Sequence, residues 1–210
     1  MRKVIFLGAG GHARVLFEIA RKEFSVLGAL AKMDSLHPNW HGLQVLGEDS
    51  AIRSYSPEDV ALVNAVGSSG LPTLRQALYE KFAAMGFTFV TMRHPSSLVA
   101  AEVQLGAGSQ VMAGAVLQPG CLIGENSIVN TGAIIDHDCQ VGPHCHIAPG
   151  STLSGSVVIG AGTHLGTGCS VIQGVKIGSR CVVGAGAVVV KDIPDGTTVV
   201  GNPARPIGSR

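Results

Sequence analysis

The sequence predicts two kinds of structure in one chain: an α/β domain over residues 1–94, followed by a parallel β-helix over residues 95–210. In the first part, strand-like and helix-like segments alternate, which is typical of a parallel sheet with crossover helices. In the second part, an aliphatic residue recurs at every sixth position, which is typical of a β-helix. That series runs without a break through Val99, Leu105, Val111, Leu117, Ile123, Val129, Ile135, Val141, Ile147, Leu153, Ile159, Leu165, Val171, Ile177, Val183 and Val189.

The first 94 residues predict a small Rossmann-like domain. Residues 3–7 form an apolar strand that ends in a glycine turn, and apolar residues at helical spacing then predict a helix over residues 13–23. The remaining elements are expected as strands at 26–30, 42–46, 59–66 and 87–90 and helices at 50–55 and 71–85. His94-Pro95 marks the end of the domain, because a residue before proline is pushed out of the helical conformation.

A second column of small residues supports the β-helix. It stands two positions before each aliphatic residue from Val103 onward, and it holds all five cysteines, which we therefore expect to be small core-facing residues in a reducing compartment. Glycine follows the aliphatic residue at seven positions, where we expect it to provide the positive φ that tight corners need. These glycines are Gly106, Gly124, Gly142, Gly160, Gly166, Gly178 and Gly184.

Composition excludes several classes of partner. The formal net charge of +1 gives no reason to expect nucleic acid or an anionic membrane as a partner. No apolar run approaches the roughly 20 residues that span a bilayer. The apolar start of the chain is cut short at Gly8, so we expect a first strand rather than a signal peptide, and a cytoplasmic protein.

The turn Gly8-Ala9-Gly10-Gly11-His12 follows a strand and opens a helix. Backbone N–H groups at such a turn can bind an anionic group of a nucleotide. The dinucleotide fingerprint asks for glycine where Ala13 stands, although alanine is tolerated there. The turn therefore predicts a nucleotide site, and a plain tight turn remains the alternative.

The strongest chemical signal is the run from Asn130 to Asp138, which reads NTGAIIDHD. It places Asp136, His137 and Asp138 at a corner of the β-helix. A histidine with an adjacent carboxylate is a standard general base near neutral pH. The sequence leaves open which of the two aspartates contacts His137, and the alternative is a merely polar surface corner.

His146 and His164 occupy equivalent strand positions one full coil apart, so we expect them to stack on one face. A metal site is the rival interpretation. The zinc site of β-helical carbonic anhydrases needs a pair of histidines five positions apart, which the β-helix of this chain lacks, and we therefore expect no metal.

Taken together, these motifs resemble bacterial sugar acetyltransferases of the sialic-acid-O-acetyltransferase type, which include enzymes that N-acetylate nucleotide-linked 4-amino sugars. The resemblance rests on the glycine turn, on the run from Asn130 to Asp138 and on His144 to Gly150. It implies a left-handed β-helix with three hexapeptides per coil, hence about five coils. It also implies acetyl-CoA as co-substrate, a nucleotide-linked sugar as acceptor and a homotrimer.

The resemblance also assigns roles to residues. The catalytic base falls on His137 and its partner carboxylate on Asp138. Acetyl-CoA binding falls on His146 and Gly155, and we also expect the stacked His164 to take part in it. Substrate binding falls on the turn residues Gly8, Gly10, Gly11 and His12, on Asn130 as a sugar contact, and on Lys32, which stands where relatives often carry acidic residues and so indicates atypical recognition of the base.

Three functions follow as hypotheses. The first is acetyl-CoA-dependent N-acetylation of a nucleotide-linked amino sugar in bacterial surface glycan biosynthesis. The second is O-acetylation of a sialic acid or another sugar, because the same base suits a hydroxyl acceptor. The third is a non-catalytic partner that stabilises another sugar-biosynthetic enzyme, against which the Asp-His-Asp corner argues.

Overall fold

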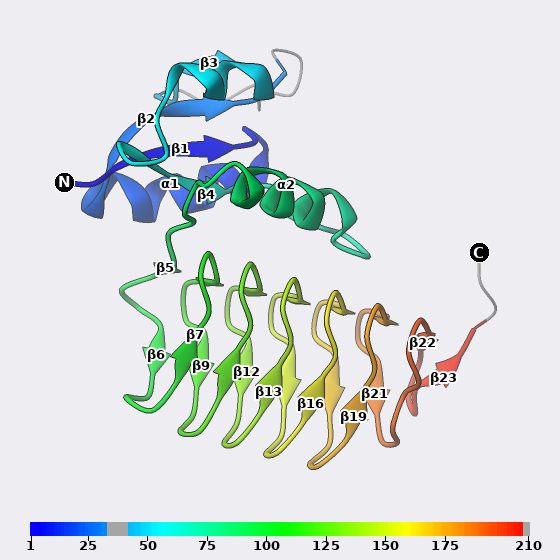
Figure 1. Cartoon of the computed structure of the whole chain (residues 1–210). Coiled ribbons are helices and arrows are strands. Elements are labelled where there is room, and N and C mark those ends of the chain that lie inside the picture. The colour runs from blue at the N-terminus through cyan, green and yellow to red at the C-terminus, as the bar shows by residue number, and fades with distance from the viewer. Residues whose placement is uncertain (33–41, 208–210) are drawn as a thin grey trace. The chain divides into compact units, whose positions relative to one another are not determined.

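The computed structural model describes residues 1–32 and 42–207, which form two compact units (Figure 1). The first unit comprises residues 1–67 and 74–92, and the second comprises residues 68–73 and the chain from Arg93 onward. The short segment 68–73 thus belongs with the second unit, although both of its neighbours in sequence belong to the first. None of the helices within the described residues is long and apolar enough to cross a membrane.

The first unit is a parallel sheet with helical connections. Its strands are β1 (Lys3–Leu7), β2 (Ser25–Leu30), β3 (Val45–Gly47) and β4 (Val60–Asn64), in the order β3-β2-β1-β4. The connections are α1 (Gly11–Glu23), the 3-10 helix η2 (Asp49–Ser54) and α2 (Thr73–Ala84). The strand predicted at residues 87–90 is reduced to a single bridge from Phe89 to Leu62.

Burial explains why these segments form this sheet. β1 and β4 are buried almost along their whole length, as expected for central parallel strands covered on both faces. Helix α1 buries one stripe at helical spacing, and Ala13, the residue in place of the third fingerprint glycine, lies within that stripe with no exposed surface. The small side chain there permits close packing of the helix.

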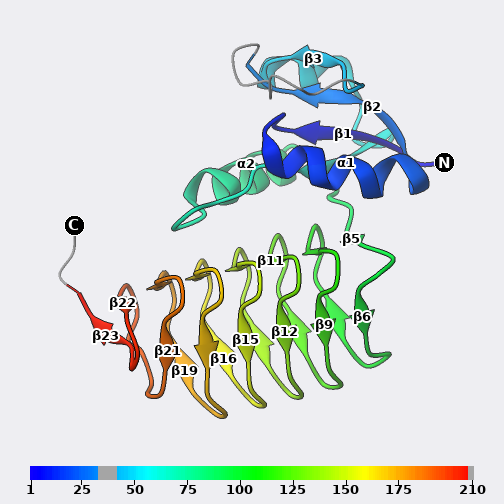
Figure 2. The ribbon, with the colours of Figure 1, turned by 180° about the vertical axis from the view of Figure 1, so that it is seen from behind.

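The second unit is the predicted left-handed parallel β-helix, in which every hexapeptide supplies a two-residue strand (Figure 2). Each strand pairs in parallel with the strand three hexapeptides further on, so that three strands complete one coil; Ile128, for example, lies opposite His146. The strands are β6 (Leu98–Val99), β7 (Gln104–Leu105), β8 (Gln110–Val111), β9 (Val116–Leu117), β10 (Leu122–Ile123), β11 (Ile128–Val129), β12 (Ile134–Ile135), β13 (Gln140–Val141), β14 (His146–Ile147), β15 (Thr152–Leu153), β16 (Val158–Ile159), β17 (His164–Leu165), β18 (Ser170–Val171), β19 (Lys176–Ile177), β20 (Val182–Val183) and β21 (Val188–Val189).

Three sheets form the walls of this prism. The first has the order β21-β18-β15-β12-β9-β6, and the second has the order β19-β16-β13-β10-β7. The third continues from β8 through β11, β14, β17 and β20, with β5 (Met92–Arg93) at its start. The second residue of most strands points inward, and these aliphatic side chains form one buried core together with the column of small residues, in which all five cysteines are buried and unpaired.

The seven corner glycines play a different part from the one predicted. Positive φ occurs three residues after the inward aliphatic residue, as at Gly120 and Gly132, and the glycines directly after that residue are not among the positive-φ positions. A Cβ on Gly124 or Gly142 would instead overlap the backbone of the next coil. These glycines are therefore required by the close stacking of coils rather than by their dihedral angles.

The last coil is closed by side chains and by a change of strand direction. Asp192 Oδ1 accepts a hydrogen bond from Lys176 N, and Asp195 Oδ1 accepts one from Ser179 N, both at 2.8 Å. β22 (Thr198–Val200) then pairs in parallel with β20, and β23 (Arg205–Pro206) pairs antiparallel with β22.

Candidate active site

The Asp-His-Asp corner joins β12 to β13 at one edge of the prism. His137 Nδ1 donates to Asp138 Oδ2 at 2.8 Å, so Asp138 is the aspartate in contact with the imidazole ring. Asp136 Oδ1 accepts from the backbone N–H of His137, also at 2.8 Å. Asp138 adopts a positive φ of 60°, a conformation that aspartate tolerates better than most residues. The other ring nitrogen, Nε2, then carries a lone pair in the neutral ring.

Electrostatics favour proton uptake at this corner. The hydrogen bond to Asp138 raises the pKa of His137 above its ordinary value, and the charge of Asp136 adds to that effect. Half of the His137 side-chain surface is exposed to solvent, as is 66% of that of Asp138. The corner therefore combines an accessible base with a carboxylate that orients it and stabilises its protonated form.

Two glycines make room for this pair. Gly155 lies one coil after His137, and a Cβ on it would lie 2.5 Å from the ring atoms Cε1 and Nε2. Gly120 lies one coil before Asp138, and a Cβ there would lie 2.5 Å from Asp138 Oδ1. Gly155, expected in the acetyl-CoA site, is therefore placed directly against the candidate base.

A second group of predicted residues lies in a cavity of about 420 Å³, here called the second cavity, on the wall formed by β11, β14, β17 and β20. These residues are Asn130, His146 and His164. Asn130 Nδ2 lies 3.0 Å from His146 Nε2, and the rings of His146 and His164 meet edge to face with centroids 5.0 Å apart. Their equivalent positions on β14 and β17 produce this stacking, as predicted. Ser68 also lines the cavity, and its Oγ lies 2.8 Å from His146 Nδ1.

The second cavity is neutral. Among the described residues that line it there is no Asp, Glu, Lys or Arg, and its titratable side chains are the two histidines. Burial lowers the pKa of His164 below its ordinary value, because a charged ring would lose its hydration there. His164 is 7% exposed, and within the described residues its Nδ1 has no hydrogen-bond partner.

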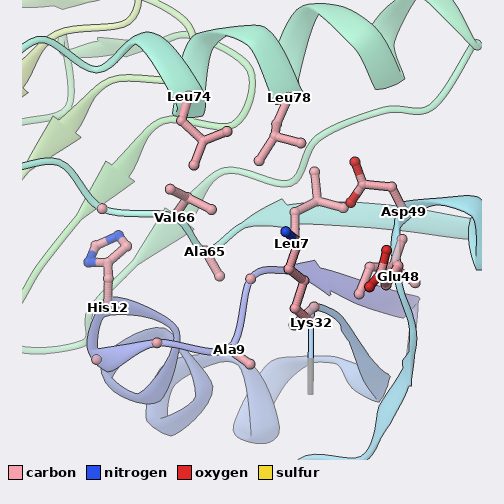
Figure 3. Close-up of a pocket in the computed structure, with 16 residues that line it drawn as sticks. Leu7, Ala9, His12, Lys32, Glu48, Asp49, Ala65, Val66, Leu74 and Leu78 are labelled. Atoms are coloured by element: carbon pink, nitrogen blue, oxygen red, sulfur yellow. The ribbon is translucent and has the colours of Figure 1, made fainter. Parts of the chain in front are cut away.

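Gly8, Gly10, Gly11, His12 and Lys32 all line a third cavity, in the α/β unit, of about 590 Å³ (Figure 3). Gly8 has a φ of +96°, and a Cβ on it would meet the side chain of Val66. A Cβ on Gly10 or Gly11 would meet nothing within 4 Å, so these two glycines keep space open for a ligand. Gly10 is the N-cap residue of helix α1 and has no side chain to bond the first N–H groups, which are suited to an anion.

Glu48 and Asp49 line the same cavity at the end opposite to His12 (Figure 3), and the sequence reasoning did not identify them. Nucleotide-binding sheets commonly place an acidic residue after the second strand, at the ribose. Here the acidic residues follow β3, the strand that pairs with β2, so they reach the cavity from the next position in the sheet. Asp49 also forms a 2.7 Å ion pair with Lys81.

Arg75 is a further residue that the sequence reasoning missed. Arg75 belongs to α2, and its side chain is buried. Its Nη1 donates to the carbonyl oxygens of Asn64 at 2.6 Å and Val66 at 2.9 Å. Burial lowers its pKa to about 9. Asn64 is the last residue of β4 and Val66 lies just beyond it, so Arg75 fixes the segment that carries Val66 and Gly67 to the third cavity. Its only sequence signal is a basic residue among the apolar positions of a helix.

The predicted site residues thus fall into three groups. His137, Asp138 and Gly155 meet at one corner; Asn130, His146 and His164 share the second cavity; the glycine turn, His12 and Lys32 share the third. Within one chain the second cavity's lining does not include His137. Among the described residues, no three side chains of the metal-binding types are grouped so that they could hold a metal ion.

Comparison with known proteins agrees with this architecture. Residues 3–82 match the PglD N-terminal domain, and residues 102–137, 120–155 and 156–191 match the bacterial transferase hexapeptide of six repeats. No curated protein matches the chain.

Solved structures match over nearly the whole chain. The acetyltransferase domain of PglB from Neisseria gonorrhoeae FA1090, in complex with acetyl coenzyme A, is 40% identical, with a TM-score of 0.89 and coverage of 98% of this chain and 99% of that one. PerB from Caulobacter crescentus, in complex with CoA and GDP-perosamine, is 40% identical, with a TM-score of 0.90 and coverage of 99% and 98%. A variant of perosamine N-acetyltransferase from the same organism is 38% identical over 100% of this chain and 98% of that one, with a TM-score of 0.89. The chain belongs to this family of hexapeptide-repeat sugar acetyltransferases with a PglD-type N-terminal domain.

Proposed function

We propose that this chain transfers the acetyl group of acetyl-CoA to the amine of a nucleotide-linked amino sugar. The observation that carries the proposal is His137, a half-exposed imidazole whose Nδ1 is held by Asp138 and whose Nε2 is left as a base. Relatives 40% identical to this chain bind acetyl coenzyme A in one case, and CoA with GDP-perosamine in the other.

The chemistry follows from this geometry. The amine nitrogen of the sugar attacks the thioester carbonyl carbon, and His137 Nε2 takes the proton that the nitrogen loses. The tetrahedral intermediate then collapses, the carbon–sulfur bond breaks, and the imidazolium returns its proton to the departing thiolate of CoA. The carboxylate of Asp138 stabilises the imidazolium between these two steps.

The cavity beside the glycine turn supplies the nucleotide site in this proposal. The phosphates bind at the uncapped start of α1, where Gly10 and Gly11 leave space. The ribose or base is contacted by Glu48 at the other end, on the side of the cavity where Lys32 also lies (Figure 3). A cation at position 32 suits a phosphate better than a ribose hydroxyl, so base recognition differs from that of relatives with acidic residues there.

A panel of acceptors tests the function. Thiol release from acetyl-CoA would be measured with UDP- and GDP-linked 4-amino sugars, with the matching 4-hydroxy sugars, and with sialic acid. We expect turnover with a 4-amino sugar and none with sialic acid, whose carboxylate would find no cationic partner among the described residues that line the second cavity. Turnover with a hydroxyl acceptor alone would establish O-acetylation instead, and turnover with none of them would favour the non-catalytic role.

We further propose a homotrimer in which neighbouring chains complete the active site. His137 lies on the edge between β12 and β13, whereas His146 lies on a different wall of the prism. A second copy can bring its corner to the cavity of the first. We also propose a cytoplasmic location, which fits five unpaired cysteines.

Mixed oligomers test the shared site. His137→Ala and His146→Ala variants, each of low activity alone, would be unfolded together and refolded, and activity would be compared with that of the separately treated variants. If corner and cavity come from different chains, a fraction of the mixed trimers contains one intact site and activity returns. No return of activity in mixtures shown to contain both chains would contradict the shared site, and light scattering reports the oligomeric state directly.

A further inference from the structure

The hydrogen bonds around His146 fix the position of its ring proton. Asn130 Oδ1 accepts from the backbone N–H of Thr131 at 2.8 Å, which orients the amide group. Asn130 Nδ2 is therefore the atom that faces His146 Nε2, at 3.0 Å, and an amide nitrogen can donate a hydrogen bond but cannot accept one. Nε2 must then accept, so the neutral ring carries its proton on Nδ1 and donates it to Ser68 Oγ at 2.8 Å.

This arrangement has a consequence for Ser68. Its oxygen already accepts from His146, so its own O–H proton points elsewhere, and Ser68 lines the same cavity as His146 and His164. His146, in contrast, has given its N–H to Ser68 and filled the lone pair of Nε2. A chain of three hydrogen bonds that all run in one direction also polarises its last donor.

We infer that Ser68, and not His146, is the hydrogen-bond donor that this cavity presents to the reacting ligand, and that Asn130 and His146 are positioning residues behind it. The inference rests on the proposed acetyl transfer and adds a binding residue from the segment 68–73. The ligand atom is an uncharged oxygen, because among the described residues the cavity lining holds no ionic group. Two oxygens fit that chemistry: the thioester carbonyl of acetyl-CoA and a hydroxyl of the sugar.

His164 gives independent support for a ligand in this cavity. Its ring is buried to more than nine-tenths, and within the described residues Nδ1 has no hydrogen-bond partner. A buried polar atom without a partner is costly, and such atoms in native proteins call for an explanation. His164 lines the same cavity as Ser68, so its ring is available to a ligand bound there.

Kinetics of Ser68→Ala, with Ser68→Thr as the conservative variant, test the donor. We expect the alanine variant to lower kcat/KM about 10- to 100-fold. The loss should be larger if Ser68 donates to the oxyanion that develops on the thioester carbonyl, and smaller if it donates to a hydroxyl of the bound sugar. The threonine variant retains the hydroxyl and should recover most of the activity. Ser96→Ala is the matched control, because Ser96 Oγ makes the same type of bond to His94 Nδ1, at 2.7 Å, and does not line the second or the third cavity. That control should stay within about twofold of the parent.

Binding measurements distinguish the two ligand oxygens. If the partner is the thioester carbonyl, Ser68→Ala weakens the binding of acetyl-CoA but leaves that of CoA unchanged. If it is a sugar hydroxyl, the KM for the sugar rises and the two coenzyme affinities are unaffected. Rates and affinities of Ser68→Ala within twofold of the parent would overturn the inference.

Nitrogen-15 NMR of the histidine rings tests the tautomer without any activity. We expect His146, assigned by loss of its signals in His146→Asn, to be protonated at Nδ1 and bare at Nε2 in the parent. Asn130→Ala removes the donor to Nε2, so the ring should shift toward the Nε2–H form, a change that a purely structural asparagine would not cause. A parent ring protonated at Nε2 would overturn the inference even if acetyl transfer is found, whereas absence of acetyl transfer with every acceptor would overturn the proposed function and leave this result intact.

Discussion

The β-helix holds imidazoles in two contrasting settings that lie close together in the sequence. His137 stands at an exposed corner beside two aspartates, and its pKa is raised. His146 and His164 lie in a cavity without ionic side chains among its described residues, and burial lowers the pKa of His164. The same ring can therefore accept a proton at one place and serve as a neutral hydrogen-bonding group at another, and its environment decides which.

Removing the exposed imidazole should have the largest effect. We expect His137→Ala to lower kcat on the order of 10²–10⁴-fold, because a general base is lost, while the melting temperature stays close to that of the parent because the side chain is half exposed. Steady-state thiol release and calorimetry measure the two quantities. His94→Ala, another histidine bonded to a neighbouring side chain, is the control. Activity within twofold of the parent would remove His137 from the mechanism.

Displacing the exposed imidazole without removing it should have the next largest effect. A Cβ on Gly155 would lie 2.5 Å from His137 Nε2, so Gly155→Ala forces the ring to move. We expect kcat to fall roughly 10- to 100-fold, because small misplacements of a catalytic group are costly. Gly70→Ala is the matched control, since a Cβ there meets nothing within 4 Å. Equal rates for the two variants would show that the position of the ring is not critical.

Replacing the carboxylate of Asp138 with a neutral amide should lower the pKa of His137, so that this ring becomes more like the neutral rings of the second cavity. A base works when deprotonated, so activity falls as the pH drops through its pKa. Asp138 raises that pKa by stabilising the imidazolium, so Asp138→Asn should move the acid limb of the pH–rate profile to lower pH and reduce the plateau about tenfold.

Asp136→Asn provides the comparison for that profile. Asp136 bonds to the backbone of His137 rather than to its ring, and it raises the pKa through charge alone. The acid limb should therefore move in the same direction but by a smaller amount. A shift to higher pH in either variant would contradict the assigned electrostatics.

Replacing one polar ring of the second cavity with an apolar ring should give the smallest effect, and the effect should be on stability. His164→Phe removes a buried nitrogen that has no partner within the described residues, so the free energy of unfolding should rise by about 1 kcal/mol. Denaturant titration at one fixed protein concentration measures it, and a lowered sugar or acetyl-CoA affinity would accompany the gain. A clear loss of stability would indicate that His164 is part of the packing rather than a group kept for a ligand.

Much of the fold was predictable because the β-helix repeats one short rule. Every sixth residue must fill the prism, so sixteen aliphatic residues at that spacing predict the strands almost residue by residue. The role of the glycines after them was not predictable, because Gly124 and Gly142 are required by backbone in the next coil, three hexapeptides away. In the α/β unit the strand at Phe89 shrank to a bridge, because a short apolar run does not reveal how far its pairing extends.

The candidate site was predictable where its signal was local. The Asp-His-Asp corner shows itself as three adjacent polar residues, and the stacking of His146 and His164 follows from their spacing. Ser68 lies 78 residues before the histidine that it contacts, in a segment that reads as an ordinary loop. Glu48 lines the third cavity from a position after β3, whereas the dinucleotide fingerprint places its acidic residue after the second strand. Such contacts depend on tertiary packing, to which no local pattern corresponds.

The aspartates at the last coil bear on how the end of a β-helix is blocked against further strands. A stack of identical rungs offers its open end as a template onto which a further strand, from another molecule, could add. Asp192 occupies the N–H of Lys176, a backbone donor that such a strand would need, and the reversed strand β23 presents the wrong direction for continuation. Both features oppose the addition of a further strand at the end of the solenoid.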